Sequence, residues 1–168
     1  QGNCGSCWAF AGVTILESIL KISGTTSDLP DLSEQFLVSC SDSNSGCGGG
    51  WPNETADFLQ VTGTPDEDCF AYCACDTACD NRCSDWQGKV KKITGWKYIA
   101  QRVPVSVDAL KTALLKGPLS TSMRVLYDFA YYDGGVYRHA IGPWLGNHAV
   151  GLVGYDDDQS CFIVKNSW

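Results

Sequence analysis

One cysteine and two histidines are the residues whose types could perform covalent chemistry together. Cys7 stands at the start of a segment with helical periodicity, where unpaired backbone N–H groups and the helix dipole favour negative charge on sulfur. A catalytic thiol also needs a base that takes the proton and later returns it. The base must be His139 or His148, since no other side chain titrates near neutrality without strong perturbation. These residue types indicate nucleophilic catalysis by a thiolate.

The symmetry of a predicted hairpin decides between the two histidines. Residues 148–155 and 161–166 flank a turn-rich run, and if the turn is centred near Asp157, facing residues have numbers that sum to 314. Because 148 and 166 sum to 314, Asn166 is expected opposite His148, with its amide on one imidazole nitrogen and the other nitrogen left for sulfur. A bulge or a one-residue slip would break this inference.

His139 is interpreted differently from His148. It follows Arg138 in a glycine-rich region, so we expect a surface or loop-bracing residue and place it outside the site. The turn residues Asp156, Asp157 and Asp158 offer a weak option for calcium, but such a turn is more often simply solvated.

Helical patterns dominate the first part of the chain and β-like patterns the second. Ser33 and Ser106 are expected to cap short helices. Helices are predicted over residues 8–22, 33–40, 54–60 and from 106 onward. Strands are predicted over residues 119–123, 135–137, 148–155 and 161–165. The pattern predicts an α+β fold with a mainly helical half at residues 1–100, a mainly β half at 101–168 and a ligand cleft between them.

Composition excludes several classes of function. The chain of 168 residues carries a net charge of -7 and has no Lys/Arg-rich run, so a nucleic-acid partner is not expected. No apolar stretch approaches the roughly 20 residues of a membrane span. Ten cysteines indicate an oxidising compartment, either secretion or a lysosome-like lumen.

Two segments are predicted to lack regular structure. Residues 46–52 contain clustered Gly and Pro, which mark sharply turning backbone. Residues 64–86 hold five cysteines among polar residues. Four thiolates could bind zinc, but the paired Cys-x-x-Cys spacing is missing, so disulfides are favoured.

The motifs resemble those of one known family. Residues 1–10, Gln-Gly-Asn-Cys-Gly-Ser-Cys-Trp-Ala-Phe, are similar to the signature around the nucleophile of papain and the cathepsins. Further matches follow in the family's order at residues 32–35, 46–50, 147–149 and 165–168. The resemblance implies one papain-like peptidase domain, a cysteine endopeptidase in which Cys7 attacks, His148 is the base and Asn166 orients it.

The resemblance also implies roles for other residues. The Gln1 side-chain amide would bind the oxyanion together with the Cys7 N–H, and Trp168 would shield the bond between His148 and Asn166 from water. Gly50 would pair with the substrate backbone. The residues assigned to substrate binding are Gly5, Gly49, Gly50, Trp51, Pro52, Ser122, Asn147, Ala149 and Trp168. Among them Trp51, Pro52, Ser122 and Ala149 would line the pocket for the second residue before the scissile bond.

Disulfide pairing is likewise taken from the resemblance. It implies the pairs Cys4–Cys47, Cys40–Cys79 and Cys69–Cys83. Cys73 and Cys75 remain, and they would stay reduced, pair with each other or exchange with neighbouring bridges, because a bridge between residues two apart is strained. Cys161 is read as a free core thiol inside a strand.

Details are closest to the cathepsin B-like and related microbial secreted branch, to which residues 127–139 are similar. The segment between Cys69 and Cys83 has no histidine pair of the kind that gives cathepsin B its dipeptidase activity, so endopeptidase action is expected. We expect no cofactor and no metal. The expected partners are polypeptide substrates and propeptide or cystatin-like inhibitors, acting on a monomer. The rival hypotheses are a catalytically silent binding protein of the same architecture, or an inactive fragment of an active parent.

Overall fold

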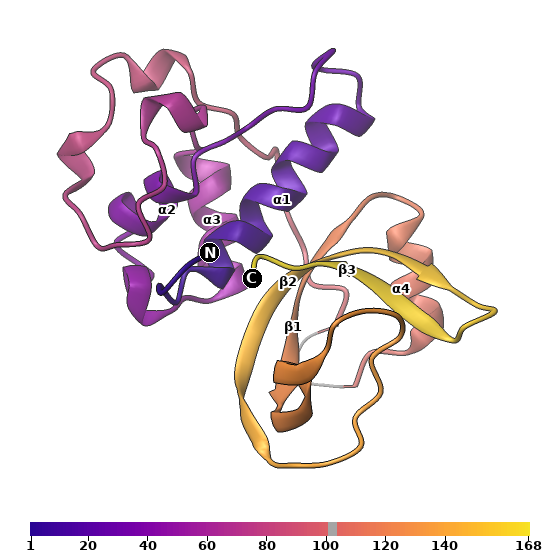
Figure 1. Ribbon diagram of the computed structural model, residues 1–168. Coiled ribbons are helices and arrows are strands. Elements are labelled where there is room, and N and C mark those ends of the chain that lie inside the picture. The colour runs from indigo at the N-terminus through magenta and orange to yellow at the C-terminus, as the bar shows by residue number, and fades with distance from the viewer. Residues whose placement is uncertain (101–103) are drawn as a thin grey trace.

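The computed structural model describes residues 1–100 and 104–168, and it has the predicted α+β architecture. The helices are α1 (Cys7–Ile22), α2 (Glu34–Cys40), α3 (Pro52–Val61) and α4 (Val107–Leu114). The strands are β1 (Leu119–Leu126), β2 (Trp144–Asp156) and β3 (Cys161–Lys165). Figure 1 shows α1, α2 and α3 grouped on one side of the molecule, with the sheet and α4 on the other.

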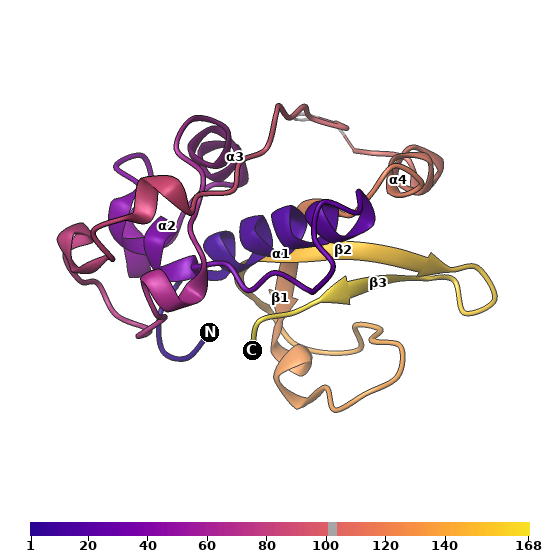
Figure 2. The ribbon, with the colours of Figure 1, turned by 90° about the horizontal axis from the view of Figure 1, so that it is seen from above.

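Helix α1 lies between the helical group and the sheet. Trp8, Val13 and Leu16 are spaced along one face and are buried in a core shared with α2 and α3. The opposite side of α1 approaches β2 so closely that a Cβ atom added at Gly151 would lie 2.9 Å from Cγ2 of Thr14. Figure 2 shows α1 running along β2. Helix α1 therefore packs against both the other helices and the sheet.

The predicted serine caps are present. The Ser33 hydroxyl accepts a hydrogen bond of 2.9 Å from the Phe36 N–H, and the Ser106 hydroxyl accepts one of 3.1 Å from Ala109. Helix α3 starts two residues earlier than predicted because Pro52 occupies its first turn, where a missing N–H carries no penalty.

The register of the hairpin between β2 and β3 differs from the predicted one. Asp156 faces Cys161, a sum of 317, and on the far side of the unpaired Val153, Gly151 faces Lys165, a sum of 316. The predicted sum of 314 was wrong because the turn holds four residues and is centred later in the chain, which gives a sum of 317 next to the turn. The irregularity at Val153 then lowers the sum by one, to 316, and so removes part of the difference.

The segment predicted as a strand at residues 135–137 is part of a loop, so that prediction was wrong. The carboxylate of Asp128 organises this loop by accepting hydrogen bonds from Tyr137 Oη at 2.5 Å and from the backbone N–H groups of Ala140 at 2.7 Å and Ile141 at 3.1 Å. These donors hold the pKa of Asp128 well below its usual range. His139 Nδ1 lies 3.0 Å from the same carboxylate and so braces the loop.

The glycine-rich segment is more regular than predicted. Gly46–Gly48 forms a single 3-10 turn, and Pro52 already belongs to α3. The turn is possible because Gly46 has a φ of 55°, a left-handed conformation that glycine adopts without strain.

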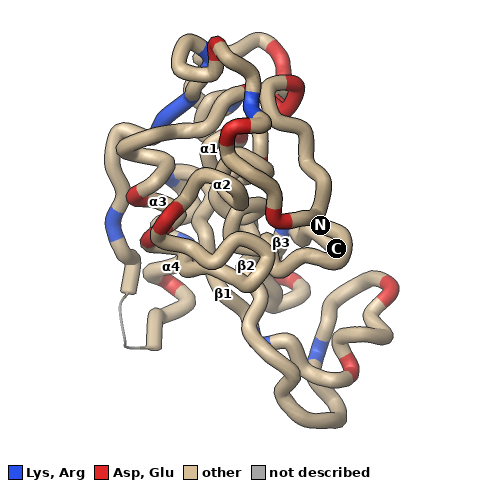
Figure 3. The backbone as a smooth tube through the Cα atoms, turned by 90° about the vertical axis from the view of Figure 1, so that its left-hand side faces the viewer, with Lys and Arg blue, Asp and Glu red and all other residues tan. Residues whose placement is uncertain are grey.

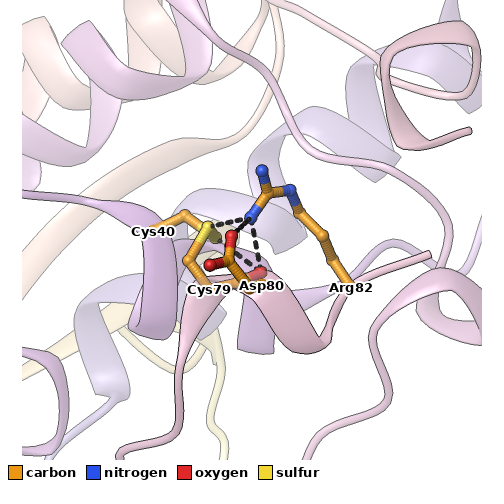
Figure 4. A network of polar contacts seen from close by, with 4 residues as sticks. All are labelled: Cys40, Cys79, Asp80 and Arg82. Atoms are coloured by element: carbon orange, nitrogen blue, oxygen red, sulfur yellow. Dashed lines mark hydrogen bonds and ion pairs between the residues drawn. A yellow bond between two sulfur atoms is a disulfide. The ribbon is translucent and has the colours of Figure 1, made fainter. Parts of the chain in front are cut away.

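The cysteine-rich loop is held by covalent bridges. Its disulfides join Cys40–Cys79, Cys69–Cys83 and Cys73–Cys75, and Cys4–Cys47 links the start of the chain to the glycine-rich turn. Three of these are the pairs that the resemblance implies. Figure 4 shows Arg82 beside the Cys40–Cys79 bridge, with its Nη1 donating to the Cys79 carbonyl at 2.6 Å and lying 3.3 Å from Asp80.

The remaining expectations concern Cys161, the boundary between the two halves, membrane-spanning helices and the distribution of charge. Cys161 is free, but it is only half-buried and thus not a core thiol. The boundary placed between residues 100 and 101 adjoins residues 101–103, which lie outside the described residues. Within the described chain, no helix is long and apolar enough to cross a membrane. Figure 3 shows acidic and basic positions scattered along the described backbone.

Candidate active site

Cys7 occupies the first position of α1 and is half-buried with a free thiol. The segment before it is fixed by the disulfide Cys4–Cys47 and by a hydrogen bond of 2.9 Å from the Gly5 N–H to the Cys47 carbonyl. Gly5 has no room for a side chain, because a Cβ atom there would lie 2.5 Å from that carbonyl oxygen. Among the described residues, the N–H groups of Cys7 and Trp8 have no hydrogen-bond acceptor. The thiol therefore lies at the unpaired, positive end of a helix.

His148 and Asn166 are in direct contact. His148 lies on β2 and is 3% exposed, and its Nε2 is 2.7 Å from Asn166 Oδ1, just beyond the end of β3. If the pairing of Gly151 with Lys165 is continued by one residue, Asn166 lies opposite Val150 and diagonal to His148. The contact that sequence symmetry predicted is present, but it arises from a diagonal pair.

Trp168 packs on the imidazole. The ring centroids of Trp168 and His148 are 4.2 Å apart, and the Phe129 ring also lies near the indole, with centroids 5.6 Å apart. Burial lowers the pKa of His148, and the hydrogen bond to Asn166 opposes this by favouring the protonated ring.

Gln1 is held at the junction between the start and the end of the described chain. Its nitrogen donates to the Ser167 carbonyl at 2.7 Å, and its Oε1 accepts from the Ser167 hydroxyl at 2.7 Å. The side-chain Nε2 donates to the Cys4 carbonyl at 2.8 Å, which leaves its second N–H group for another acceptor. Figure 1 shows the two ends of the chain side by side near the start of α1.

No hydrogen bond joins Cys7 to His148 in the part of the chain that the structure describes. Residues close to Cys7 and to His148 in the chain nevertheless line one cavity. A cavity of about 240 Å³ lies between α1 and the sheet, and its lining includes Phe10 and Ala11 from the first turns of α1 together with Ala149 and Asn166.

The same cavity is bordered by carboxylates. Glu17 lies 3.8 Å from Lys165 across the cavity wall and accepts a hydrogen bond from the Leu32 N–H at 3.0 Å. Burial, together with the nearby carboxylates of Glu17 and Glu67, raises the pKa of Glu34 to about 8. Glu17 and Glu34 thus both line the cavity on the side of α1 that faces the sheet.

Three of the predicted substrate-binding residues line a second hollow. It measures about 250 Å³, and Gly49, Gly50 and Trp51 form part of its wall. Trp51 is 69% exposed, and its N–H donates to Asn44 Oδ1 at 2.8 Å. Gly50 permits this arrangement because a Cβ atom there would lie 2.6 Å from the Trp8 indole.

Four further residues of the predicted substrate-binding set lie on the helix α3 and on the sheet. Pro52 begins α3, and Ser122 of β1 faces Ala149 of β2 in the antiparallel ladder. Asn147 precedes His148 on β2 and is exposed. In the described structure, no group of three His, Cys, Asp or Glu side chains is arranged to hold a metal ion.

The sequence profile of papain family cysteine proteases matches residues 1–168. The chain belongs to the papain family of cysteine proteases. Cathepsin B-like CP2 of Giardia intestinalis is 37% identical over 177 residues, which cover 100% of this chain and 58% of that protein. Thiol protease SEN102 of a Hemerocallis species is 38% identical over 174 residues, covering 100% of this chain and 46% of that protein. The chain thus spans less than two thirds of these relatives.

Solved structures agree with this assignment to the papain family. The Carica candamarcensis cysteine protease CMS1MS2, solved in complex with E-64, is similar with a TM-score of 0.82 and 32% identity, over 99% of this chain and 74% of that one. The two curated relatives named above have nearly equal identities, so overall identity does not separate the cathepsin B-like branch from the plant proteases.

Sequence reasoning on this papain-family chain missed two positioning side chains. Tyr72, in the cysteine-rich loop, contacts both Gln1 and Ser6, and Ser167 holds the Gln1 amide. Ser167 is a polar residue inside the motif at residues 165–168, and this position could have marked it as a candidate site residue. Nothing local marks Tyr72, because its partners lie about 70 residues earlier in the chain.

Proposed function

We propose that this papain-family chain is a cysteine endopeptidase that hydrolyses peptide bonds through Cys7, His148 and Asn166. The observation that carries the proposal is the hydrogen bond of 2.7 Å between His148 Nε2 and Asn166 Oδ1, with the Trp168 indole packed on the imidazole. An amide oxygen at Nε2 keeps a proton there, which leaves Nδ1 as the nitrogen that exchanges a proton with sulfur.

The reaction follows the usual course of acyl transfer. The Cys7 thiol gives its proton to His148 Nδ1, and the thiolate attacks the peptide carbonyl to form a tetrahedral intermediate. Its oxyanion accepts hydrogen bonds from the Cys7 N–H and the free N–H of the Gln1 amide. The C–N bond breaks as His148 protonates the leaving amine, and His148 then activates the water that hydrolyses the thioester and restores the thiol.

The substrate is proposed to lie along the hollow at Gly49, Gly50 and Trp51. Gly50 would pair with the substrate backbone, because no side chain blocks its approach. Facing each other on the sheet, Ser122 and Ala149 would form the opposite wall of the pocket for the second residue before the scissile bond. Among solved relatives, one protease is in complex with E-64 and another is in its proform, which supports proposing propeptide or cystatin-like inhibitors as partners here.

The setting of the reaction is proposed from the cysteines. Four disulfides are stable only where the surroundings are oxidising, so secretion or a lysosome-like lumen is the proposed location. We propose that the protein works as a monomer without metal or cofactor.

The test is hydrolysis of a fluorogenic peptide and of a longer polypeptide, followed by end-group analysis of the products. Cleavage at internal bonds is expected, with a loss of about 10²- to 10⁴-fold in His148→Ala, the range for removal of a general acid–base. His139→Ala is the matched control, since that histidine braces a loop instead. Release of dipeptides alone would contradict endopeptidase action, and equal losses in both histidine variants would contradict the role of His148.

A further inference from the structure

Tyr72 lies in the cysteine-rich loop, yet its hydroxyl reaches both ends of the segment that precedes the nucleophile. The Tyr72 oxygen is 2.7 Å from the Gln1 carbonyl oxygen and 2.5 Å from Ser6 Oγ. Ser6 is fully buried, so its hydroxyl cannot form a hydrogen bond with bulk water.

The direction of the two hydrogen bonds follows from the proton count. A carbonyl oxygen only accepts, so the single proton of the phenol is donated to Gln1. The Ser6 hydroxyl must then donate its own proton to the Tyr72 oxygen. The result is a short chain of hydrogen bonds from Ser6 through Tyr72 to Gln1.

This chain of bonds changes what Ser6 does at α1. Ser6 has the position of an N-cap, but its hydroxyl accepts no hydrogen bond from the helix, whereas Ser33 and Ser106 cap α2 and α4 through their hydroxyls. Since an N-cap side chain would neutralise part of the positive helix end, diverting Ser6 leaves the first turn at Cys7 electrostatically open.

Tyr72 also completes the fixation of Gln1. Ser167 holds the Gln1 nitrogen and Oε1, the Cys4 carbonyl holds Nε2, and Tyr72 holds the Gln1 carbonyl. The backbone and side chain of Gln1 are thereby both constrained, and one N–H of its amide remains free.

The position of Tyr72 is itself well defined. Its ring packs edge-on against Phe10 with centroids 4.9 Å apart, and its N–H donates to Glu67 Oε1 at 2.6 Å. The adjacent Cys73 is tied to Cys75 by a disulfide and donates its N–H to Gln35 at 3.1 Å. Burial raises the pKa of Tyr72, so the phenol keeps its proton across the neutral range.

We propose that Tyr72 is a positioning residue for oxyanion binding. It draws the Ser6 hydroxyl away from α1 and fixes the Gln1 backbone, so that the Cys7 N–H and the Gln1 amide are both set toward the developing oxyanion. This inference rests on the proposed function, because it assigns Tyr72 a place in the same acyl-transfer site.

The test compares two reactions of the same thiol in Tyr72→Phe, which keeps the ring on Phe10 and removes only the hydroxyl. Hydrolysis of a peptide amide needs the oxyanion site, whereas alkylation of Cys7 by iodoacetamide does not. We expect kcat for hydrolysis to fall about tenfold, less than the 10²- to 10³-fold for loss of a direct oxyanion donor, with KM unchanged. The alkylation rate should fall by a clearly smaller factor, since the Ser6 hydroxyl becomes free to cap the helix end at Cys7. In a Gln1→Ala background the same change should have a smaller effect, since part of the action of Tyr72 passes through Gln1.

Thr64→Val is the matched control. It also removes one buried hydroxyl bond, of 2.7 Å to the Ser33 carbonyl, but it does not touch the nucleophile segment, so hydrolysis and alkylation should stay in their original ratio. Unchanged hydrolysis in Tyr72→Phe, or parallel losses of hydrolysis and alkylation, would overturn the proposal. If the unaltered chain neither hydrolyses peptides nor alkylates faster than a free thiol, the proposed function fails instead.

Hydrogen exchange provides a readout that does not depend on activity. Loss of the Tyr72 hydroxyl should speed amide exchange in the peptide covering residues 1–7, while Thr64→Val should not. Identical exchange of that peptide in Tyr72→Phe and the unaltered chain would refute the positioning role, whatever the activity.

Discussion

His148 Nε2 and Asn166 Oδ1 lie 2.7 Å apart, and the same amide oxygen accepts the Ser167 N–H at 2.8 Å. Because a backbone N–H can only donate, the Asn166 atom facing both partners is the oxygen, and His148 Nε2 must carry a proton. The tautomer of the neutral imidazole is thereby fixed, with Nδ1 as the basic nitrogen.

Replacing Asn166 with Ala should slow peptide hydrolysis by about tenfold or more, the equivalent of one hydrogen bond of about 1.4 kcal/mol lost from the transition state. The variant should also lower the pKa of His148 further, because the bond to Asn166 favours the protonated ring. Steady-state kinetics and NMR titration of the imidazole measure the two effects. Asn81→Ala, in the cysteine-rich loop, is the matched control, and a His148 titration that does not move would argue against the orienting role.

Trp168→Ala should move the pKa of His148 upward, toward its ordinary value of 6.5. Burial is the main cause of the lowered pKa, and the indole packed on the imidazole contributes to that burial. A histidine whose folded-state pKa is depressed gives stability that is present above pH 6.5 and lost as the pH falls through the folded-state value. The variant should therefore lose less stability on acidification, as followed by urea unfolding between pH 7 and 5.

The exposed Trp96 offers a comparison for that experiment, since Trp96→Ala removes an indole from the other half of the chain. Equal shifts of the His148 titration in both variants would show that Trp168 has no special contact with the imidazole.

Glu34→Gln should stabilise the protein at neutral pH. The folded-state pKa of Glu34 is about 8 because of burial and neighbouring carboxylates, against an ordinary value of 4.5. With a raised folded-state pKa, stability is complete below pH 4.5 and declines as the pH rises through 8. The glutamine variant escapes this decline, so its free energy of unfolding should exceed that of the unaltered chain by at least about 1.4 kcal/mol at pH 8, one pKa unit, and match it near pH 4.

Urea unfolding at the two pH values measures this difference. Asp42→Asn removes an exposed carboxylate as the control and should show no such change between pH 4 and 8. If Glu34→Gln changes the free energy of unfolding by the same amount at both pH values, the change comes from packing and not from the titration of Glu34.

Gly50→Ala should destabilise the wall of the hollow formed by Gly49, Gly50 and Trp51. The added Cβ would lie 2.6 Å from the Trp8 indole and 2.5 Å from Asn44 Oδ1, and overpacking of this kind costs about 1–3 kcal/mol. Gly48→Ala is a close control, since its Cβ would meet only Ser45 at 3.4 Å. Thermal unfolding of the two variants compares them directly, and equal melting temperatures would mean that Trp8 can move aside.

Local signals in the sequence were sufficient for the helices. The periodic apolar residues of α1 and the capping serines Ser33 and Ser106 determine where helices begin, and those features act within a few residues. The strand predicted at residues 135–137 failed because the Asp128 carboxylate organises this stretch as a loop, by binding the Tyr137 hydroxyl and the backbone N–H groups of Ala140 and Ile141, and no local pattern reveals such a tertiary partner.

The contact between His148 and Asn166 could be predicted from the sequence, but the geometry that produces it could not. The symmetry argument paired His148 with Asn166 through a register that the hairpin does not have, and their contact survives because diagonal neighbours on a sheet are still within reach. Contacts between distant segments, such as Tyr72 with Gln1 or Gly151 with Thr14, depend on the packing of the two halves and leave no periodic trace in the sequence.

We expect Cys7 to be a nucleophile that is activated by His148, and covalent labelling of the two free cysteines tests this role. The structure provides an internal reference, because Cys161 is the other cysteine outside a disulfide in the described chain and is also half-buried. A brief, substoichiometric exposure to an epoxide inhibitor of papain-like enzymes, followed by intact-mass analysis and peptide mapping, should give a single adduct on Cys7. That adduct should be lost or strongly slowed in His148→Ala. Labelling of Cys161 instead, or an equal rate in His148→Ala, would contradict the account.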